Sequence, residues 1–463
     1  MTTVLSPIPE QAVLRDATEL GALAALVGAD ESVPLVDGRR VRYANLDYAA
    51  SAPSLQAVAD RVAAALPLYS SVHRGAGYTS QVCTAAYESA RRTVAGFVGA
   101  REEDVVIFTR NTTDALNLLA STVAAVSAAD GVGSVVYLDI EHHANLLPWQ
   151  AIGGRVVEAR ETLAETLRAL EAELERTPVA LLAVTGASNV TGELLPLAVL
   201  AELAHRHGAR IAVDGAQLVP HRRVDLAATG IDYLAFSGHK LYAPFGSGVL
   251  VGRRDWLDAA PPHLAGGGAV RSVSLDGAVW ADSPARHEAG TPNVVGALAL
   301  AAACCAVQEL RPEVIVTHEG ELLRRLDQGL AEIGATSLRL WAEGTERIAV
   351  VTFTVPGFSA ELVAQYLSAE HGIGVRDGKF CAHPLLARFD AADGAVRASI
   401  GLGSTQVDVD RLISALRQLR VEGPNWTYER QNGYLAPSPD PRALPSWIDP
   451  ATASAGPSPC AAE

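Results

Sequence analysis

The sequence predicts an α/β protein, with a large domain built on a mostly parallel sheet and a smaller α+β domain after it. Between residues 46 and 300, short apolar runs rich in valine, isoleucine and leucine alternate with longer segments of helical period. These runs lack the in–out alternation of a strand with one wet face, so we expect helices on both faces of the sheet. The chain has 463 residues, 49% of them hydrophobic, which suffices for one large or two ordinary domains.

The expected elements follow in order along the chain. Six apolar runs of the large domain are predicted to be strands: residues 105–109, 135–139, 181–185, 211–214, 233–236 and 248–251. A helical stretch near 294–335 precedes a strand at 348–355, a helix at 359–371, a loop through Cys381, a strand at 396–401 and a helix at 407–420. We therefore expect an N-terminal segment (1–45) with one short helix, a large α/β domain (46–300), a small α+β domain (301–423) that carries Cys381, and a proline-rich tail (424–463).

The tail is too rich in proline, serine, alanine and glycine to form a core of its own. It does contain four aromatic residues, Trp426, Tyr428, Tyr434 and Trp447. We expect this aromatic part to drape over the folded body, and the end of the chain to be loose, so that the tail is partly disordered.

Composition excludes several classes of function. The net charge of −15 and the pI near 5.3 argue against a nucleic-acid partner, because phosphate binding needs a basic face. No run approaches the roughly 20 apolar residues of a membrane span, and the first residues do not resemble a secretory signal, so a soluble cytoplasmic protein is expected. The five cysteines show no metal-ligand spacing, so neither a metal site nor a disulfide framework is expected.

Lysine is rare in this chain: of the 37 basic residues, only Lys240 and Lys379 are lysines. Lysine can lose its proton and form a Schiff base, which arginine cannot. Lys240 follows the predicted strand 233–236, and Asp214 ends the predicted strand 211–214. Ligands of open α/β sheets bind outside the carboxyl ends of the strands, so both side chains are expected in one crevice. A buried carboxylate there requires a cationic partner, such as a protonated pyridine nitrogen.

Eight ordered motifs carry a resemblance to a known family. They are VHRG (72–75), NTTDALN (111–117), EHHANLLPWQ (141–150), SNVTGE (188–193), VDGAQ (213–217), FSGHKLYAP (236–244), EAGTPN (288–293) and VRDGKFCAHPLL (375–386). From about residue 45 to about residue 420, the chain resembles the class V aminotransferase superfamily of fold-type I pyridoxal-phosphate enzymes. Within it, the chain is most similar to the SufS-like group of cysteine desulfurases and selenocysteine lyases.

The resemblance implies a binding site for pyridoxal 5′-phosphate. Lys240 would bind the cofactor covalently and carry a proton at the substrate Cα, and Asp214 would keep the pyridine nitrogen protonated. Gln217 would hydrogen-bond the O3′ oxygen, and His142 would stack on the ring and take part in catalysis; its neighbour His143 is the alternative. Asn189 would lie near the cofactor and the substrate carboxylate. The phosphate would be bound by the start of a helix at 112–120 and by side chains of Thr112, Thr113, Ser237, His239 and, from a partner subunit, Thr291.

The same resemblance assigns the substrate side of the site. Arg397 would bind the α-carboxylate in bidentate fashion, Arg376 would be a second active-site arginine, and Arg74 would line the entrance. Cys381 lies in a polar loop near Arg376 and Lys379, where a lowered pKa would favour the thiolate. In the family, the equivalent cysteine takes sulfur from the substrate as a persulfide. Cys83, Cys304 and Cys305 fall in predicted helices and are expected to be buried and inert.

The expected function is therefore a homodimeric, pyridoxal-phosphate-dependent cysteine desulfurase that converts L-cysteine to L-alanine, with a possible sulfur-acceptor protein as partner. The chain departs from the family in Asp377–Phe380, where a Thr-Gly-His-His type of sequence is usual, and at His383. These departures leave another class V enzyme as the alternative: a selenocysteine lyase, C–S β-lyase, aminotransferase or epimerase of a specialised biosynthetic pathway. A scaffold that retains the cofactor without turnover is a third possibility.

Overall fold

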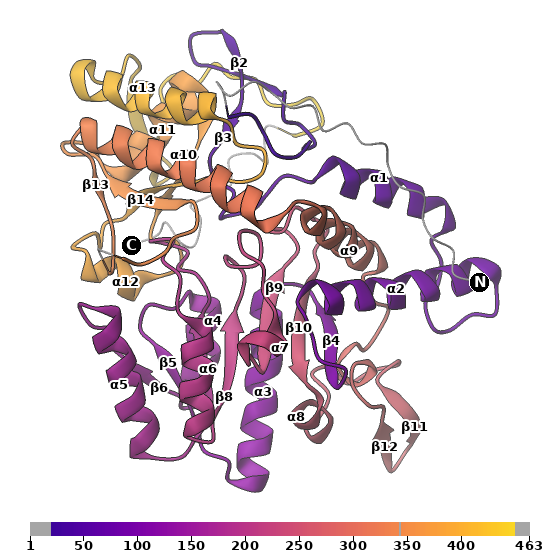
Figure 1. The fold of residues 1–463 in the computed structure, drawn as a ribbon. Helices are drawn as coiled ribbons and strands as arrows, with labels where there is room; N and C mark the ends of the chain where they lie inside the picture. Colours follow the sequence, from indigo (N-terminus) through magenta and orange to yellow (C-terminus); the bar gives the residue numbers. More distant parts are fainter. Residues whose placement is uncertain (1–19, 342–343, 450–463) are drawn as a thin grey trace.

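A seven-stranded sheet lies at the centre of the computed structural model, which describes residues 20–341 and 344–449 (Figure 1). Its strand order is β4-β10-β9-β8-β7-β5-β6. All neighbours pair in parallel except β10, which is antiparallel to both β4 and β9. The strands are β4 (Asp104–Thr109), β5 (Ser134–Leu138), β6 (Arg155–Val157), β7 (Val179–Thr185), β8 (Arg210–Asp214), β9 (Tyr233–Ser237) and β10 (Gly248–Arg253).

This sheet confirms the predicted α/β fold with its mostly parallel sheet. The six predicted strands are all present, with small differences at their ends, whereas the short edge strand β6 was not predicted. Successive residues of a strand face two separate cores: Ile211 and Val213 of β8 belong to one, and Ala212 belongs to the other. Both faces of the sheet are therefore buried, as the uniformly apolar runs indicate.

Helices connect the strands and cover the sheet. A hairpin of β11 (Val270–Ser274) and β12 (Gly277–Trp280), which was not predicted, projects at the lower right of Figure 1. The helices before residue 310 are α1 (Gln56–Ala65), α2 (Tyr78–Phe97), α3 (Thr112–Asp130), α4 (His143–Ala151), α5 (Leu163–Arg176), α6 (Leu197–Arg206), α7 (Leu226–Thr229), α8 (Arg254–Ala259) and α9 (Val294–Glu309), with the 3-10 turns η1 (Leu66–Leu68) and η2 (Ala285–His287).

The predicted helical stretch 294–335 consists of two helices, α9 and α10 (Pro312–Glu332), because Pro312 begins a new helix. Helix α9 packs against α1 and α2. None of the helices in the described ranges is by itself long and apolar enough to cross a membrane. Together, α9 and α10 have the length and composition for a broken span, bent by 84°.

The second core lies in the upper left part of Figure 1, around a four-stranded antiparallel sheet of order β13-β14-β17-β16. Helices α10, α11 and α13 pack there. The elements are β13 (Thr336–Ser337), β14 (Val350–Thr354), α11 (Ala360–His371), β15 (Ile373–Gly374), β16 (Arg376–Gly378), α12 (His383–Arg388), β17 (Ala395–Ser399) and α13 (Gln406–Glu422). The division of the chain at residues 45, 300 and 423 stays a prediction.

Residues 20–45 form no helix, so the short helix predicted within residues 1–45 stays a prediction. They contain the hairpin of β1 (Ser32–Pro34) and β2 (Arg40–Arg42), followed by β3 (Ala44–Asn45). Residues 1–19 lie outside the described part of the chain. Strand β3 pairs in parallel with β15, so the start of the chain is attached to the second core.

Residues 44–52, which we name the strap, connect the second core with the edge of the large sheet. On one side, Ser399 N–H donates to the Leu46 carbonyl at 2.7 Å, and Ala49 N–H donates to Ser399 Oγ at 2.9 Å. On the other side, Ala52 N–H donates to the carbonyl of His239 at 2.8 Å. The strap thereby links β17, which carries Arg397, to the loop that carries Lys240.

The tail forms a hairpin of β18 (Tyr428–Gln431) and β19 (Tyr434–Pro437) that packs on α11. Glu370 of α11 accepts hydrogen bonds from Tyr428 Oη at 2.9 Å and from Asn425 N–H at 3.0 Å. The prediction that aromatic residues attach the tail holds for Tyr428, but Trp447 is 82% exposed. The predicted loose end falls within residues 450–463, which lie outside the described part.

Candidate active site

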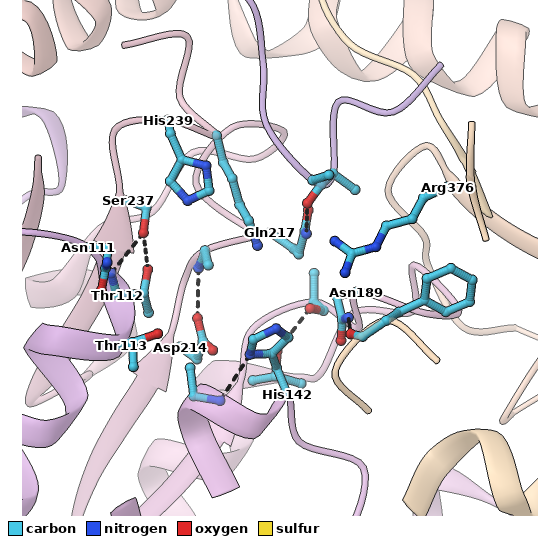
Figure 2. A pocket seen from close by; sticks show the side chains of 18 of the residues that line it. Asn111, Thr112, Thr113, His142, Asn189, Asp214, Gln217, Ser237, His239 and Arg376 are labelled. Atoms are coloured by element: carbon cyan, nitrogen blue, oxygen red, sulfur yellow. Dashed lines mark hydrogen bonds between the residues drawn. The ribbon is translucent and has the colours of Figure 1, made fainter. Parts of the chain in front are cut away.

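A cavity of about 210 Å³ lies at the carboxyl edge of the large sheet, where β4, β5, β7, β8 and β9 end. Most of the predicted site residues line it, although they come from distant parts of the chain (Figure 2). These are Thr112, Thr113, His142, Asn189, Asp214, Gln217, Ser237, His239, Lys240, Arg376 and Arg397. In Figure 2, Thr112, Thr113 and Ser237 lie on the left and Arg376 on the right, so the cavity has two chemically different ends.

Lys240 enters the cavity from the turn after β9. Burial lowers the pKa of Lys240 to about 8, an effect that Asp214 opposes and that the charges of Arg397 and Arg376 reinforce. A substantial fraction of the amine is therefore neutral near pH 8, as a nucleophile for an aldehyde must be.

Asp214 is the last residue of β8 and is 4% exposed. Its Oδ1 accepts the N–H of Ala216 at 2.9 Å. Burial raises the pKa of Asp214, whereas the Ala216 hydrogen bond and the charge of Lys240 lower it. A carboxylate in this position favours a cationic ligand group beside it.

His142 caps the start of α4 and has a defined tautomer. Its Nδ1 accepts the N–H of Ala144 at 3.0 Å, so the ring proton is assigned to Nε2. Burial lowers the pKa of His142 to about 3, and the positive charges of Lys240 and His143 add to this effect. The ring is therefore neutral at physiological pH and can lie flat against an aromatic ligand.

Hydroxyl and amide donors surround the start of α3. Thr112 N–H donates to Ser237 Oγ at 2.8 Å, and the two hydroxyls are 2.7 Å apart. Asn111 caps the helix by accepting the N–H of Asp114 at 2.9 Å. Burial lowers the pKa of His239 to about 4. A helix start with two hydroxyl groups is suited to a phosphate.

Arg397 lies at the other end of the cavity, in β17, and is 1% exposed. Its Nη2 is 3.2 Å from Asp47 Oδ1, its Nη1 donates to the Asn189 carbonyl at 3.1 Å, and its Nε has no hydrogen-bond partner among the described residues. Burial lowers the pKa of Arg397 to about 10. Arg376, on the neighbouring strand β16, is directly opposite Arg397 in the register.

Residues 376–383, which we name the cysteine loop, contain Cys381 and run along the end of the cavity where Arg397 lies. Phe380 and Cys381 have φ values of 53° and 54°, a left-handed conformation that is unfavourable for residues with side chains. Two hydrogen bonds of 2.8 Å stabilise this conformation of the loop: Asn189 Nδ2 donates to the Phe380 carbonyl, and His143 N–H donates to the Cys381 carbonyl. Phe380 lines the cavity, and its ring centroid is 5.2 Å from the Arg397 guanidinium.

Cys381 is half-buried and lies next to the cavity wall rather than in it. Burial lowers the pKa of Lys240 and of Arg397, and a negative charge on Cys381 opposes this effect weakly at both residues. His383, one of the departures from the family, is exposed, and its ring centroid is 4.6 Å from that of His143.

Besides Cys381, two predicted site residues lie outside the cavity lining, Arg74 and Thr291. Arg74 is exposed, and its Nη2 donates to the carbonyls of Gly267 at 2.9 Å and Gly290 at 3.1 Å. Thr291 follows Gly290 and is also exposed. The two residues therefore lie close to each other on the surface, and neither lines the cavity.

The other cysteines differ from the prediction in one case. Cys83 in α2 and Cys304 in α9 are buried, as predicted, but Cys305 is exposed. Cys305 follows Cys304 on a helix, so its side chain points in a different direction. Cys460 lies outside the described residues.

Sequence reasoning missed three residues around the cavity. Asp47 pairs with Arg397, and Phe380 was noted only as a departure from the family. Glu141 is fully buried; it accepts Thr185 N–H at 3.0 Å, and burial raises its pKa well above the usual value. Spacing gave no signal for them, although Glu141 belongs to the EHHAN motif.

The fold and the site define a class of protein: a fold-type I enzyme with a lysine and an aspartate at the carboxyl edge of its sheet. Residues 44–412 match the family "Aminotransferase class-V", and the chain belongs to this family, whose members depend on pyridoxal phosphate.

Named relatives agree with this assignment. A cysteine desulfurase of Dickeya dadantii (strain 3937) is 40% identical over 398 residues, 83% of this chain and 93% of that protein. The apo structure of a cysteine desulfurase from Thermococcus onnurineus NA1 has a TM-score of 0.75 and 32% identity, covering 81% of this chain and 94% of the other. Cysteine desulfurase CsdA of Escherichia coli has a TM-score of 0.72 and 33% identity, with the same coverages of 81% and 94%.

Proposed function

We propose that the protein is a cysteine desulfurase, which transfers the sulfur of L-cysteine to Cys381 and releases L-alanine. The observation that carries the proposal is the meeting of three groups at one cavity: the amine of Lys240, the guanidinium of Arg397 and the cysteine loop. In this cavity, Arg397 could bind the carboxylate of L-cysteine, and the thiol of Cys381 could react with its sulfur.

The donor set fits pyridoxal phosphate. Lys240 would bind its aldehyde, Asp214 its pyridine nitrogen and Gln217 its ring oxygen, while the neutral ring of His142 would lie on its face. Its phosphate would lie at the start of α3, with the hydroxyl and imidazole groups of Thr112, Thr113, Ser237 and His239. When bound, the cofactor supplies an electron sink that stabilises negative charge at the substrate Cα.

The residues of this chain would supply the other functions. Arg397 binds the α-carboxylate, and the neutral amine of Lys240 removes the Cα proton. The Cys381 thiolate attacks the substrate sulfur, so that an S–S bond forms and the C–S bond breaks. The electron pair of the broken bond stays with the carbon skeleton, and the proton of the substrate thiol ends on Cβ, which becomes the methyl group of alanine. Lys240 returns to Cα the proton that it removed. Cys381 then holds the persulfide, and L-alanine leaves.

The test is the product profile of the purified holoenzyme with L-cysteine and a reductant. We expect equal amounts of L-alanine and sulfide. Cys381→Ala should abolish both products, a loss of at least about 10²-fold, while the cofactor absorbance remains. Cys305→Ala removes an exposed thiol outside the cavity and is the matched control. Pyruvate, racemised substrate or sulfide release by Cys381→Ala would contradict the proposal.

The proposal includes a homodimer. Thr291 and Arg74 are exposed and do not line the cavity of their own chain, which suits groups that complete the site of a partner subunit. It also includes a protein acceptor for the persulfide sulfur, since the half-buried Cys381 lies beside the exposed His383.

A further inference from the structure

The substrate end of the cavity carries an excess of positive charge. Arg376, Arg397 and Lys240 all line it. Lys240 is assigned to the cofactor, which leaves two arginines facing the substrate. The backbone of Arg376 pairs with β17, but its guanidinium makes no hydrogen bond or ion pair with a described residue, so no direct partner neutralises its charge.

Asp47 is the acid that balances this end. Its carboxylate is 3.2 Å from Arg397 Nη2, and its side chain is 27% exposed, against 2% for Arg397. Burial raises the pKa of Asp47, whereas the charges of Arg397, Arg376 and Lys240 all lower it. The same three cations that line the cavity therefore act on this one carboxylate.

The backbone fixes Asp47 in this place. Asp47 N–H donates to Asn45 Oδ1 at 3.0 Å, and Asp47 forms a bridge with Ser399, two residues after Arg397. Because the strap is bonded to β17 on one side and to the His239 carbonyl on the other, the Asp47 backbone is held beside β17, within reach of the Arg397 guanidinium.

We propose that Asp47 is a specificity-determining residue that limits the site to amino acids with a single carboxylate. This inference rests on the proposed function, since it assigns the substrate end to Arg397. With Asp47 present, the two arginines and Asp47 leave one net positive charge, which matches one α-carboxylate. Asp377, the other acid that interacts with Arg376, is exposed to solvent and does not line the cavity. Without it, two neighbouring cations would face the ligand and would favour a second acidic group.

The experiment compares the binding of L-alanine, which carries one carboxylate, with that of L-aspartate, which carries two. Binding to the holoenzyme is measured by the change in cofactor absorbance, so the result does not depend on desulfurase turnover. In Asp47→Asn, we expect the affinity for L-aspartate relative to L-alanine to rise by about tenfold or more. Asp47→Glu keeps the charge and should retain a ratio close to that of the wild type.

Asp327→Asn is the matched control. Asp327 also pairs with a buried arginine, Arg347, at 2.8 Å, with exposed fractions of 37% and 7%, but neither residue lines the cavity. This variant should leave the ratio unchanged. An unchanged ratio in Asp47→Asn, or an equal change in Asp327→Asn, would overturn the inference.

The wild type provides a further check that requires no variant to fold. Its site should bind L-aspartate at least about tenfold more weakly than L-alanine. Equal binding would also overturn the inference. If the wild type discriminates as expected but yields neither L-alanine nor sulfide from L-cysteine, the proposed function fails and the charge argument stands.

Discussion

The two ends of the cavity are built in different ways. At the cofactor end, Asp214 and Ser237 occupy the last positions of β8 and β9, and Thr112 begins α3. At the substrate end, Cys381 follows Phe380 in a left-handed conformation that Asn189 maintains by a hydrogen bond. Sheet topology thus places the groups suited to a common cofactor, whereas tertiary contacts place the thiol that would decide which bond breaks.

Removal of the lysine amine should have the largest effect at the cofactor end. For Lys240→Ala, we expect turnover of L-cysteine to fall by at least about 10³-fold, because this amine is assigned both the cofactor and the Cα proton. Lys379→Ala is the control for the labelled position, since Lys379 is the other lysine of the chain and does not line the cavity; it should leave the cofactor label unchanged. The measurement is L-alanine formation, together with borohydride reduction and mapping of any cofactor-labelled peptide. A label on Lys379 would reverse the assignment.

Phe380→Ala tests the substrate end alone. Loss of this buried ring should lower the free energy of unfolding by about 3 kcal/mol and raise the KM for L-cysteine by about tenfold, because the ring packs against Arg397. Bound cofactor per subunit should stay unchanged. Phe380→Leu keeps an apolar side chain, so it should recover most of the stability but not the KM. A loss of cofactor in both variants would show that the two ends are not independent.

The smallest expected effect concerns pH at the cofactor end. With a Lys240 pKa of about 8, the amine is mostly protonated at pH 7 and mostly neutral at pH 9. The rate at which the apoprotein binds pyridoxal phosphate should therefore rise with pH, by about tenfold between pH 7 and pH 9. Stopped-flow absorbance measures this rate. A rate that still climbs steeply above pH 9 would indicate an amine with an ordinary pKa.

The same contrast explains what could be predicted from the sequence. Strands buried on both faces leave an apolar pattern, and polar residues directly after them mark the carboxyl edge, so Lys240 and Asp214 could be placed from the pattern alone. Asp47 could not be predicted in this way, because its pairing with Arg397 joins residues 350 positions apart and leaves no local pattern in the sequence. The β18–β19 hairpin was missed for a related reason: it is held by long-range hydrogen bonds from Tyr428 Oη and Leu435 N–H to Glu370 and Glu361 of α11, which leave no local pattern.

The strap has a consequence for synthesis of the protein. Residues 44–49 leave the ribosome long before their pairing partners at residues 373–374 and 399, which are joined to the strap by hydrogen bonds, one of them across 350 positions. The first-made segment of the site must therefore wait, unpaired, while the central sheet forms. Closure of this long-range link is the step that brings Asp47 to Arg397, so the site becomes complete only after residue 399 has left the ribosome.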